Sequence, residues 1–242
     1  MTSSSLPPPV LRGTTQNRVV VSYAVAPNQL APLLPDGLVP HTRDGSAYVS
    51  LAGVELTKVH VLGVSGPGLW RVPAVELRVH VRPADGDADA AGTWTVQAHT
   101  SRRLAAWGAR LLYREPVAVT SMQPVRREPM EHVEVTYRFD WAGREQRLRV
   151  RGERLPVMPA PDAPALSLLR PRWRYTTTRN DSLLRARIER PTTPIHRVQE
   201  HHVTVQWEDV YGPIGQLVST HDPAHVLLSP GTPVTLRWRE RV

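Results

Sequence analysis

Short runs of alternating apolar and polar residues, separated by clusters of glycine, proline and aspartate, constrain the fold of this chain more than any other feature. Alternation with a period of two is typical of strands that bury one face, and helical patterns do not separate the runs. The sequence therefore predicts a meandering, mainly β fold rather than βαβ units. We expect strands at residues 18–24, 47–56, 59–64, 74–82, 93–100, 117–122, 131–141, 144–154, 172–178, 183–189, 198–208 and 233–239.

Helical patterns are scarce. The best candidate covers residues 101–113, because Thr100 or Ser101 can cap it and Leu104, Trp107 and Leu111 fall near one face. A second, short helix is expected at residues 27–34. Residues 155–171 contain five prolines, which predicts a long irregular loop between strands.

The length of 242 residues is within the range of a single β domain. We expect a flexible N-terminal tail at residues 1–16 and one domain at residues 17–242. No apolar run approaches the roughly 18 residues that span a bilayer, and the first residues do not resemble a secretory signal, so we expect a cytoplasmic protein without a membrane partner.

Composition narrows the chemistry that is available. The chain has no cysteine, which excludes disulfides, thiolate metal sites and cysteine nucleophiles. The net charge is +8, but 29 of the 30 basic residues are arginines, dispersed along the chain and at most paired. This skew suggests a GC-rich bacterial genome, and the dispersal argues against a nucleic-acid partner.

Alternation places Glu76, Arg78 and His80 on one face of a strand and the intervening valines and leucine on the other. If the ionisable face points inward, the three groups could bind a carboxylate or move a proton. The alternative is an ordinary solvated face over an apolar core. Alternation alone favours this second interpretation.

Other candidate sites carry weaker signals. Neighbouring histidines such as His201 and His202 point to opposite sides of a strand, so we expect no metal site there, nor around His221 and His225. Lys58 is the only side-chain amine that could form a Schiff base, but its setting is typical of a surface strand. We expect neither a metal nor an organic cofactor.

Four segments together resemble the YqjF-like proteins (domain of unknown function 2071), which are related in fold to acetoacetate decarboxylase. The segments are Ala26-Pro27 through Leu33-Leu34-Pro35 to Ala47-Tyr48-Val49; Ala74 to Val81; Tyr113-Arg114-Glu115-Pro116-Val117; and Leu168 to Tyr175 with Arg187 to Pro191. The resemblance implies a curved, double-layered, barrel-like antiparallel sheet around a central cavity, with one main helix. It therefore favours the inward interpretation of Glu76, Arg78 and His80.

Departures from the family pattern bear on function. Val117 occupies the position of the decarboxylases' Schiff-base lysine, which excludes imine catalysis there, and Arg190 occupies that of a family histidine. We expect a cofactor-independent lyase or isomerase that acts on a small carbonyl or carboxylate compound. Its catalytic residues would be Glu76 as proton acceptor and His80 as partner, and its ligand-binding residues Arg78, Arg172, Arg190 and Trp173.

The alternative is a non-catalytic carrier or sensor of a small hydrophobic acid, which the exchanged family carboxylates favour. In either case the expected partner is a small molecule, and assembly into a homo-oligomer stays open.

Overall fold

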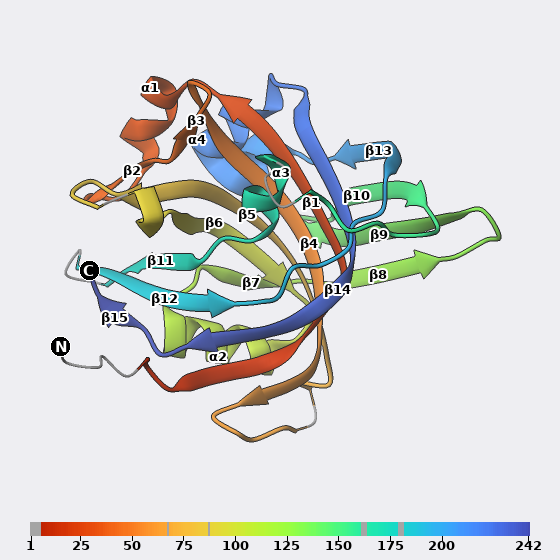
Figure 1. Cartoon of the computed structure of the whole chain (residues 1–242), viewed down its shortest axis with the longest axis horizontal. Helices are drawn as coiled ribbons and strands as arrows, with labels where there is room; N and C mark the ends of the chain where they lie inside the picture. Colours follow the sequence, from red (N-terminus) through yellow and green to blue (C-terminus); the bar gives the residue numbers. More distant parts are fainter. Residues whose placement is uncertain (1–5, 67, 87, 161–163, 179–181) are drawn as a thin grey trace.

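Across the residues that the structure describes, the strands form two sheets, one of eleven strands and one of four (Figure 1). The computed structural model describes residues 6–66, 68–86, 88–160, 164–178 and 182–242. Its strands are β1 (Pro9–Val25), β2 (Leu38–Pro40), β3 (Thr42–Arg43), β4 (Ser46–Val61), β5 (Arg71–Pro83), β6 (Gly92–Thr100), β7 (Val117–Val119), β8 (Met122–Arg127), β9 (His132–Trp141), β10 (Arg144–Glu153), β11 (Trp173–Thr177), β12 (Leu183–Glu189), β13 (Val198–Thr204), β14 (Pro223–Arg237) and β15 (Glu240–Arg241). Its helices are α1 (Pro27–Leu30), α2 (Arg103–Tyr113), α3 (Pro164–Leu169) and α4 (Trp207–Ser219), with short 3-10 turns η1 (Ala31–Leu33) and η2 (Ala88–Ala90).

The larger sheet curves into a ring. Strand β5 pairs with β4 on one side and with β6 on the other, and the path β5-β4-β1-β14-β12-β11-β6 returns to β5. Most pairs are antiparallel, but β6 runs parallel to both β11 and β7. The predicted mainly β, curved and double-layered fold is therefore confirmed, with a mixed rather than purely antiparallel sheet.

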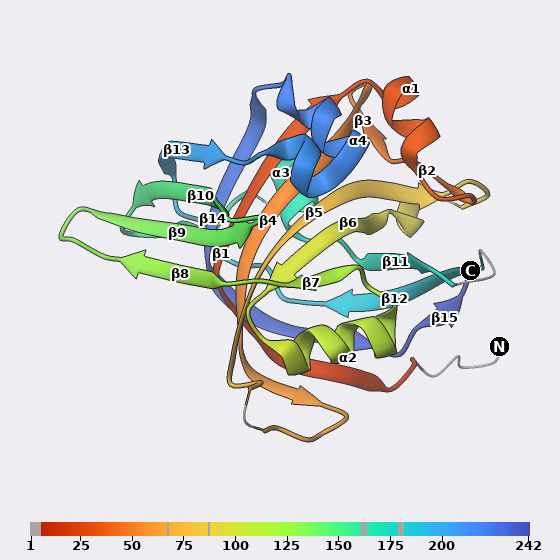
Figure 2. The same ribbon diagram turned by 180° about the vertical axis from the view of Figure 1, so that it is seen from behind.

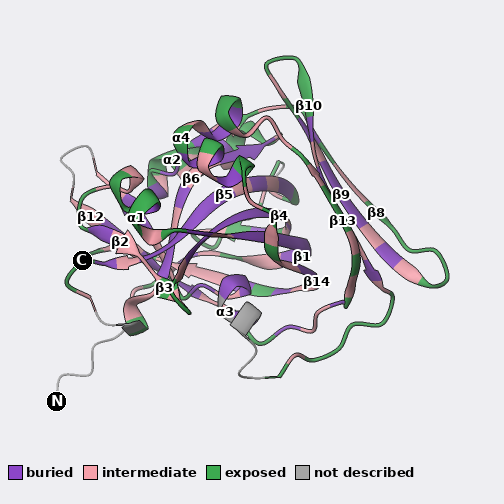
Figure 3. Ribbon diagram, turned by 90° about the horizontal axis from the view of Figure 1, so that it is seen from above, coloured by how far each residue is buried: buried purple, intermediate pink, exposed green. Residues whose placement is uncertain are grey.

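The smaller sheet, in the order β13-β10-β9-β8, forms the second layer beside the ring (Figure 3). One hydrophobic core joins the two sheets and α4, with valines of β1, β4 and β5 packed against Tyr137, Phe139 and Leu148. The two layers approach closely at Gly53 of β4, where a Cβ atom would lie 2.5 Å from the ring of Tyr137. The absence of a side chain at this position therefore lets the layers meet.

The helices differ most from expectation. Helix α2 forms within the predicted range, but Leu104, Trp107 and Leu111 are exposed rather than packed on the sheet. Helix α3 interrupts the predicted loop at residues 155–171, and α4 was not predicted. Helices α2 and α4 lie at opposite ends of the molecule (Figure 2). No helix among the described residues has the length and apolar character that a membrane crossing requires.

The N-terminal strand starts earlier than predicted. Residues 9–16, expected in a flexible tail, belong to β1, where Pro9 pairs with Arg237 and Thr15 pairs with both Thr232 and Leu56. The strand therefore covers half of the expected tail, because β14 pairs with these residues from Pro9 onward and β4 from Leu11 onward. Residues 1–5 lie outside the described range.

Candidate functional site

Each central strand of the ring has one face toward the hydrophobic core and an opposite face toward the inside of the ring, which we call the inner face. On β5, Val75, Leu77 and Val79 belong to the core, whereas Glu76, Arg78 and His80 lie on the inner face. Arg78 and His80 are only 4% and 5% exposed, and the Glu76 side chain 12%. The solvated alternative is therefore wrong, and the inward orientation is confirmed.

Strand pairing aligns further inner-face residues with this group. Ser22 of β1 pairs with Ser50 of β4, and Ser50 pairs with Arg78 of β5. Arg78 in turn pairs with Thr95 of β6, next to a bulge between Leu77 and Arg78. One row of polar side chains therefore runs across four neighbouring strands.

Arg174 of β11 connects two buried carboxylates. Its guanidinium lies 2.7 Å from Glu76 Oε2, donates a 2.8 Å hydrogen bond to Thr95, and contacts Glu115, which follows α2. Glu76 also lies 3.5 Å from Arg78 Nη1. Both carboxylates are therefore held by arginines, and Nε and Nη2 of Arg174 are engaged by them.

Other guanidinium groups are less well paired. Arg78 donates a 2.8 Å hydrogen bond to the main-chain oxygen of Leu168 in α3, and Arg190 donates one of 3.5 Å to that of Leu169. Among the guanidinium groups next to Glu76, three buried nitrogen atoms have no hydrogen-bond partner within the described residues: Nη2 of Arg18, Nε of Arg78 and Nε of Arg190. Since buried donors are normally satisfied, these atoms require an acceptor that the chain does not supply.

We call Arg18, Glu76, Arg78, Glu115, Arg174 and Arg190 the arginine–glutamate cluster. Four guanidinium groups face two carboxyl groups, so the cluster has an excess of two positive charges when all are ionised. Burial, together with Arg190 and Arg78, holds the pKa of Arg18 well below its usual value. The cluster thus has the electrostatics of an anion site.

The two carboxyl groups respond differently to burial. Burial alone would raise the pKa of Glu76, but the charges of Arg174 and Arg78 outweigh it and lower this pKa to about 2. Burial raises the pKa of Glu115, although Arg174 opposes the shift. Glu76 is therefore ionised and a weak proton acceptor, which fits a role in orienting arginines better than the predicted role as a base.

A second polar feature adjoins the cluster. Nε2 of His80 lies 2.9 Å from Oγ of Ser50, which lies 2.8 Å from Oγ of Ser22. All three side chains are buried. Burial, and then the charge of Arg78, hold the pKa of His80 well below its usual value, so the imidazole is neutral. We call Ser22, Ser50 and His80 the serine–histidine chain.

Two of the predicted ligand-binding residues do not reach this region. Arg172 precedes β11 and is exposed, and the structure places Arg174 in the cluster instead. Trp173 lies on the opposite face of β11, packed against the core beneath the guanidinium of Arg185. Neither side chain therefore lies in the cluster, because Arg172 precedes the strand and alternation turns Trp173 to the face opposite Arg174. Arg78 and Arg190 do lie in the cluster.

Sequence reasoning missed Arg18, Arg174, Glu115 and Ser50. Arg174 lies in the expected strand 172–178 on the same face as Arg172, so alternation gives both residues the same signal, and only the observed start of β11 at Trp173 separates them. Glu115 precedes a proline directly after the predicted helix, which is a signal for a turn but not for burial. Arg18 and Ser50 carry no local signal, since only strand pairing brings them to the inner face.

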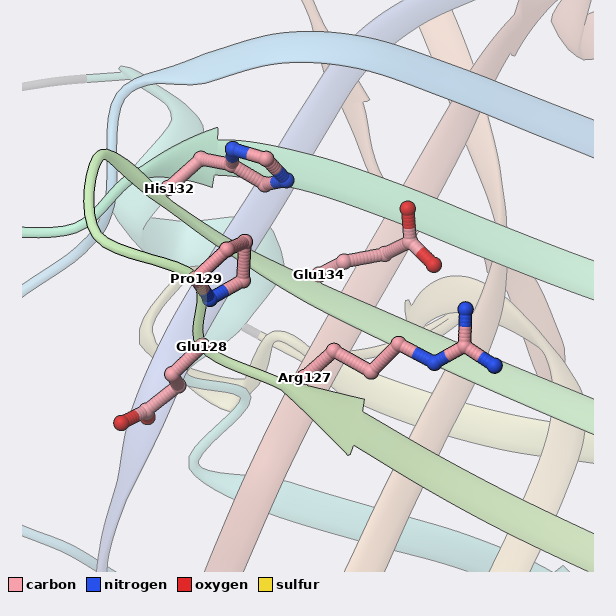
Figure 4. A pocket seen from close by; sticks show the side chains of 5 residues that line it. All are labelled: Arg127, Glu128, Pro129, His132 and Glu134. Atoms are coloured by element: carbon pink, nitrogen blue, oxygen red, sulfur yellow. The ribbon is translucent and has the colours of Figure 1, made fainter.

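Outside the cluster, an open groove of about 530 Å³ lies at the free end of the hairpin β8–β9 (Figure 4). Arg127 and Glu134 project on the same side of the hairpin, whereas Glu128 points away. Glu134 also pairs with Arg149 at 2.7 Å. Both glutamates of the groove are thus engaged by arginines outside its lining, Glu128 by Arg126 and Glu134 by Arg149. Across the described ranges, no three His, Asp or Glu side chains are grouped as metal ligands.

Comparison with solved structures identifies the fold. An acetoacetate decarboxylase-like enzyme from Sphingomonas wittichii RW1 matches with a TM-score of 0.64 at 13% identity, covering 100% of this chain and 96% of that chain. The enduracididine biosynthesis enzyme MppR complexed with pyruvate matches at 0.64 and 14%, covering 99% and 93%. Acetoacetate decarboxylase from Legionella pneumophila matches at 0.64 and 11%, covering 100% and 92%. The chain therefore has the acetoacetate decarboxylase-like fold.

Sequence comparison gives the family. A search of curated proteins found no match. The model of the uncharacterized conserved proteins with domain of unknown function 2071 matches residues 13–233, which includes the whole ring apart from the ends of β1 and β14 and all of β15. The resemblance seen in the four sequence segments is confirmed, and the chain belongs to the DUF2071 family.

Proposed function

We propose that the arginine–glutamate cluster binds the carboxylate of a small carbonyl compound and that the protein is an enzyme of lyase or isomerase type working without a Schiff base. The observation that carries the proposal is the set of unpartnered buried nitrogen atoms on Arg18, Arg78 and Arg190. A guanidinium offers forked donors that match the two oxygens of a carboxylate. A carboxylate would satisfy these donors and offset the excess positive charge.

The residues of the cluster divide into two groups under this proposal. Arg18, Arg78 and Arg190 would contact the ligand, because each has a free donor. Arg174, Glu76 and Glu115 would hold the arrangement rigid, because their charged groups already contact each other. Val117, at the start of β7, supplies no amine, which is consistent with chemistry other than imine formation.

The test uses pyruvate, since a structural relative at 14% identity is described as complexed with it. Calorimetric titration at low salt should show binding of pyruvate and none of pyruvamide, which has the same shape without the negative charge. Arg18→Met should weaken pyruvate binding at least tenfold. The matched control is Arg147→Met, at a half-exposed arginine of the smaller sheet that should leave binding unchanged. Equal binding of pyruvamide, or no effect of Arg18→Met, would contradict the proposal.

A non-catalytic binding protein is the second candidate, and one observation favours it. The low pKa of Glu76 removes the predicted general base from the site. A carrier or sensor would bind the same carboxylate and leave it unchanged. Binding of pyruvate together with unchanged ligand after prolonged incubation would support this candidate.

A further inference from the structure

We infer that the serine–histidine chain is the proton-transfer device of the site, with Ser50 as the group that meets the ligand and His80 as the proton acceptor behind it. The inference rests on the proposed function, since it concerns the same ligand. It replaces Glu76 in the role of base. Ser50 and Ser22 thereby acquire a function that sequence reasoning did not assign to them.

The position of Ser50 supports this assignment. Ser50 and Arg78 face each other across β4 and β5, and opposite residues on one face of a sheet have Cβ atoms roughly 5 Å apart. A carboxylate on the free Nε of Arg78 would bring the adjacent carbonyl and its α-carbon toward the Ser50 hydroxyl. His80 is one pair further along the same inner face.

The hydrogen-bond geometry allows a proton to move away from the ligand. Ser50 can donate to Nε2 of the neutral His80 over 2.9 Å while its oxygen accepts a proton from the ligand. The hydroxyl of Ser22, 2.8 Å from that of Ser50, orients the Ser50 hydroxyl toward His80. The ligand also improves the base, because a bound carboxylate offsets the charge of Arg78, which disfavours protonation of His80 in the empty site.

The step balances without a further reactant. For pyruvate, a methyl C–H bond breaks and its proton goes to Ser50 Oγ as the Ser50 proton passes to His80 Nε2. The electron pair of the C–H bond forms a carbon–carbon double bond, and the carbonyl oxygen becomes an enolate that the arginines stabilise. The reverse transfer restores pyruvate. In D₂O the imidazolium exchanges its proton with solvent, so the net result is deuterium in the methyl group.

Proton NMR of pyruvate in D₂O tests the inference directly. The protein should accelerate loss of the methyl signal over buffer, and Ser50→Ala and His80→Gln should each slow the exchange at least 100-fold. Pyruvate affinity, measured separately by calorimetry, should stay within about threefold in both variants, since neither removes an arginine donor. The matched control is Thr136→Val, which removes a buried hydroxyl from β9 of the smaller sheet, away from the arginine–glutamate cluster, and should exchange at the wild-type rate.

The possible outcomes separate the two proposals. If pyruvate binds and exchanges no faster than in buffer, the serine–histidine chain has no such role, although the proposed binding function holds. Unchanged exchange in Ser50→Ala also overturns the inference. If pyruvate does not bind at all, the proposed function fails and the proton-transfer role fails with it. Ser50→Ala removes a single oxygen, so it keeps the test decisive even if His80→Gln does not fold.

Discussion

At the scale of single residues, Arg18 shows how a binding site can lower stability. The side chain is 4% exposed, and its Nη2 atom has no hydrogen-bond partner. A buried, incompletely paired charge is costly, and its removal can stabilise a fold. If the cluster is the anion site proposed above, this residue therefore destabilises the ligand-free protein.

Arg18→Met should raise the free energy of unfolding of the ligand-free protein by about 1–3 kcal/mol, a rise in Tm of roughly 3–10 °C. Thermal unfolding monitored by circular dichroism measures this. The same variant is expected to lose pyruvate binding, so stability and affinity should change in opposite directions. A fall in Tm would mean that Arg18 is satisfied in solution, for example by ordered water.

Residue patterns in the sequence revealed part of this site. Alternation brought Glu76, Arg78 and His80 together correctly, because the period of a strand is local information. The partners of these residues depend on register between strands distant in sequence. Arg174 reaches Glu76 across 98 positions, and no local pattern encodes such a contact. Arg172 and Arg174 are two positions apart and would share a face in one strand, so alternation does not distinguish them; β11 begins only at Trp173, which leaves Arg172 outside the sheet.

At the scale of elements, two glycines make opposite contributions to the stability of the fold. Gly53 of β4 lies where the two sheets meet, and an added Cβ would clash with the ring of Tyr137 at 2.5 Å. Gly108 lies inside α2, where an added Cβ would meet nothing within 4 Å. The first glycine is required by packing, and the second only loosens its helix.

Gly53→Ala should therefore lower the free energy of unfolding by about 1–3 kcal/mol, because the layers must separate to admit the methyl group. Gly108→Ala should raise it by about 0.5–1 kcal/mol, since alanine is the better helix former. Chemical denaturation of both variants beside the wild-type protein measures the two values. Equal effects of the same sign on the free energy of unfolding would contradict the close packing of Gly53 against Tyr137.

The sequence predicted elements well where a pattern is uninterrupted and poorly where it is broken. Strand β12 has its predicted bounds, whereas β4 was expected as two strands, because Lys58 and its neighbours interrupt the alternation. Lys58 has a φ of 51°, so the irregularity is real, but the strand continues past it. Helix α4 was missed because Gly212 and Pro213 produce a kink inside it.

At the scale of the whole molecule, several buried histidines favour the neutral form and should make the fold sensitive to acid. The pKa values of His41, His80, His99 and His196 are all lowered, in each case mainly by burial. The unfolded chain binds protons from about pH 6.5 downward, before the folded chain does. Stability is therefore full above pH 6.5 and falls as pH decreases.

The contribution of His99 to this pH dependence of stability can be measured separately. It stacks on Phe139 with ring centroids 4.9 Å apart, neither ring nitrogen has a hydrogen-bond partner, and burial lowers its pKa to about 4. The free energy of unfolding of the wild-type protein should fall between pH 7 and pH 5. In His99→Leu this fall should be smaller by about 2 kcal/mol. Urea denaturation at the two pH values measures it. This window lies above the range in which Glu76, with a pKa of about 2, begins to contribute.

The contact between Arg78 and α3 affects how such a site can diversify. Arg78 is anchored by the main-chain oxygen of Leu168, an atom that every amino acid carries. Exchanging side chains in α3 leaves this anchor in place, whereas inserting or deleting residues beside the helix shifts it. A change in the length of the connection between β10 and β11 would therefore alter the shape of the site more directly than side-chain exchange in α3.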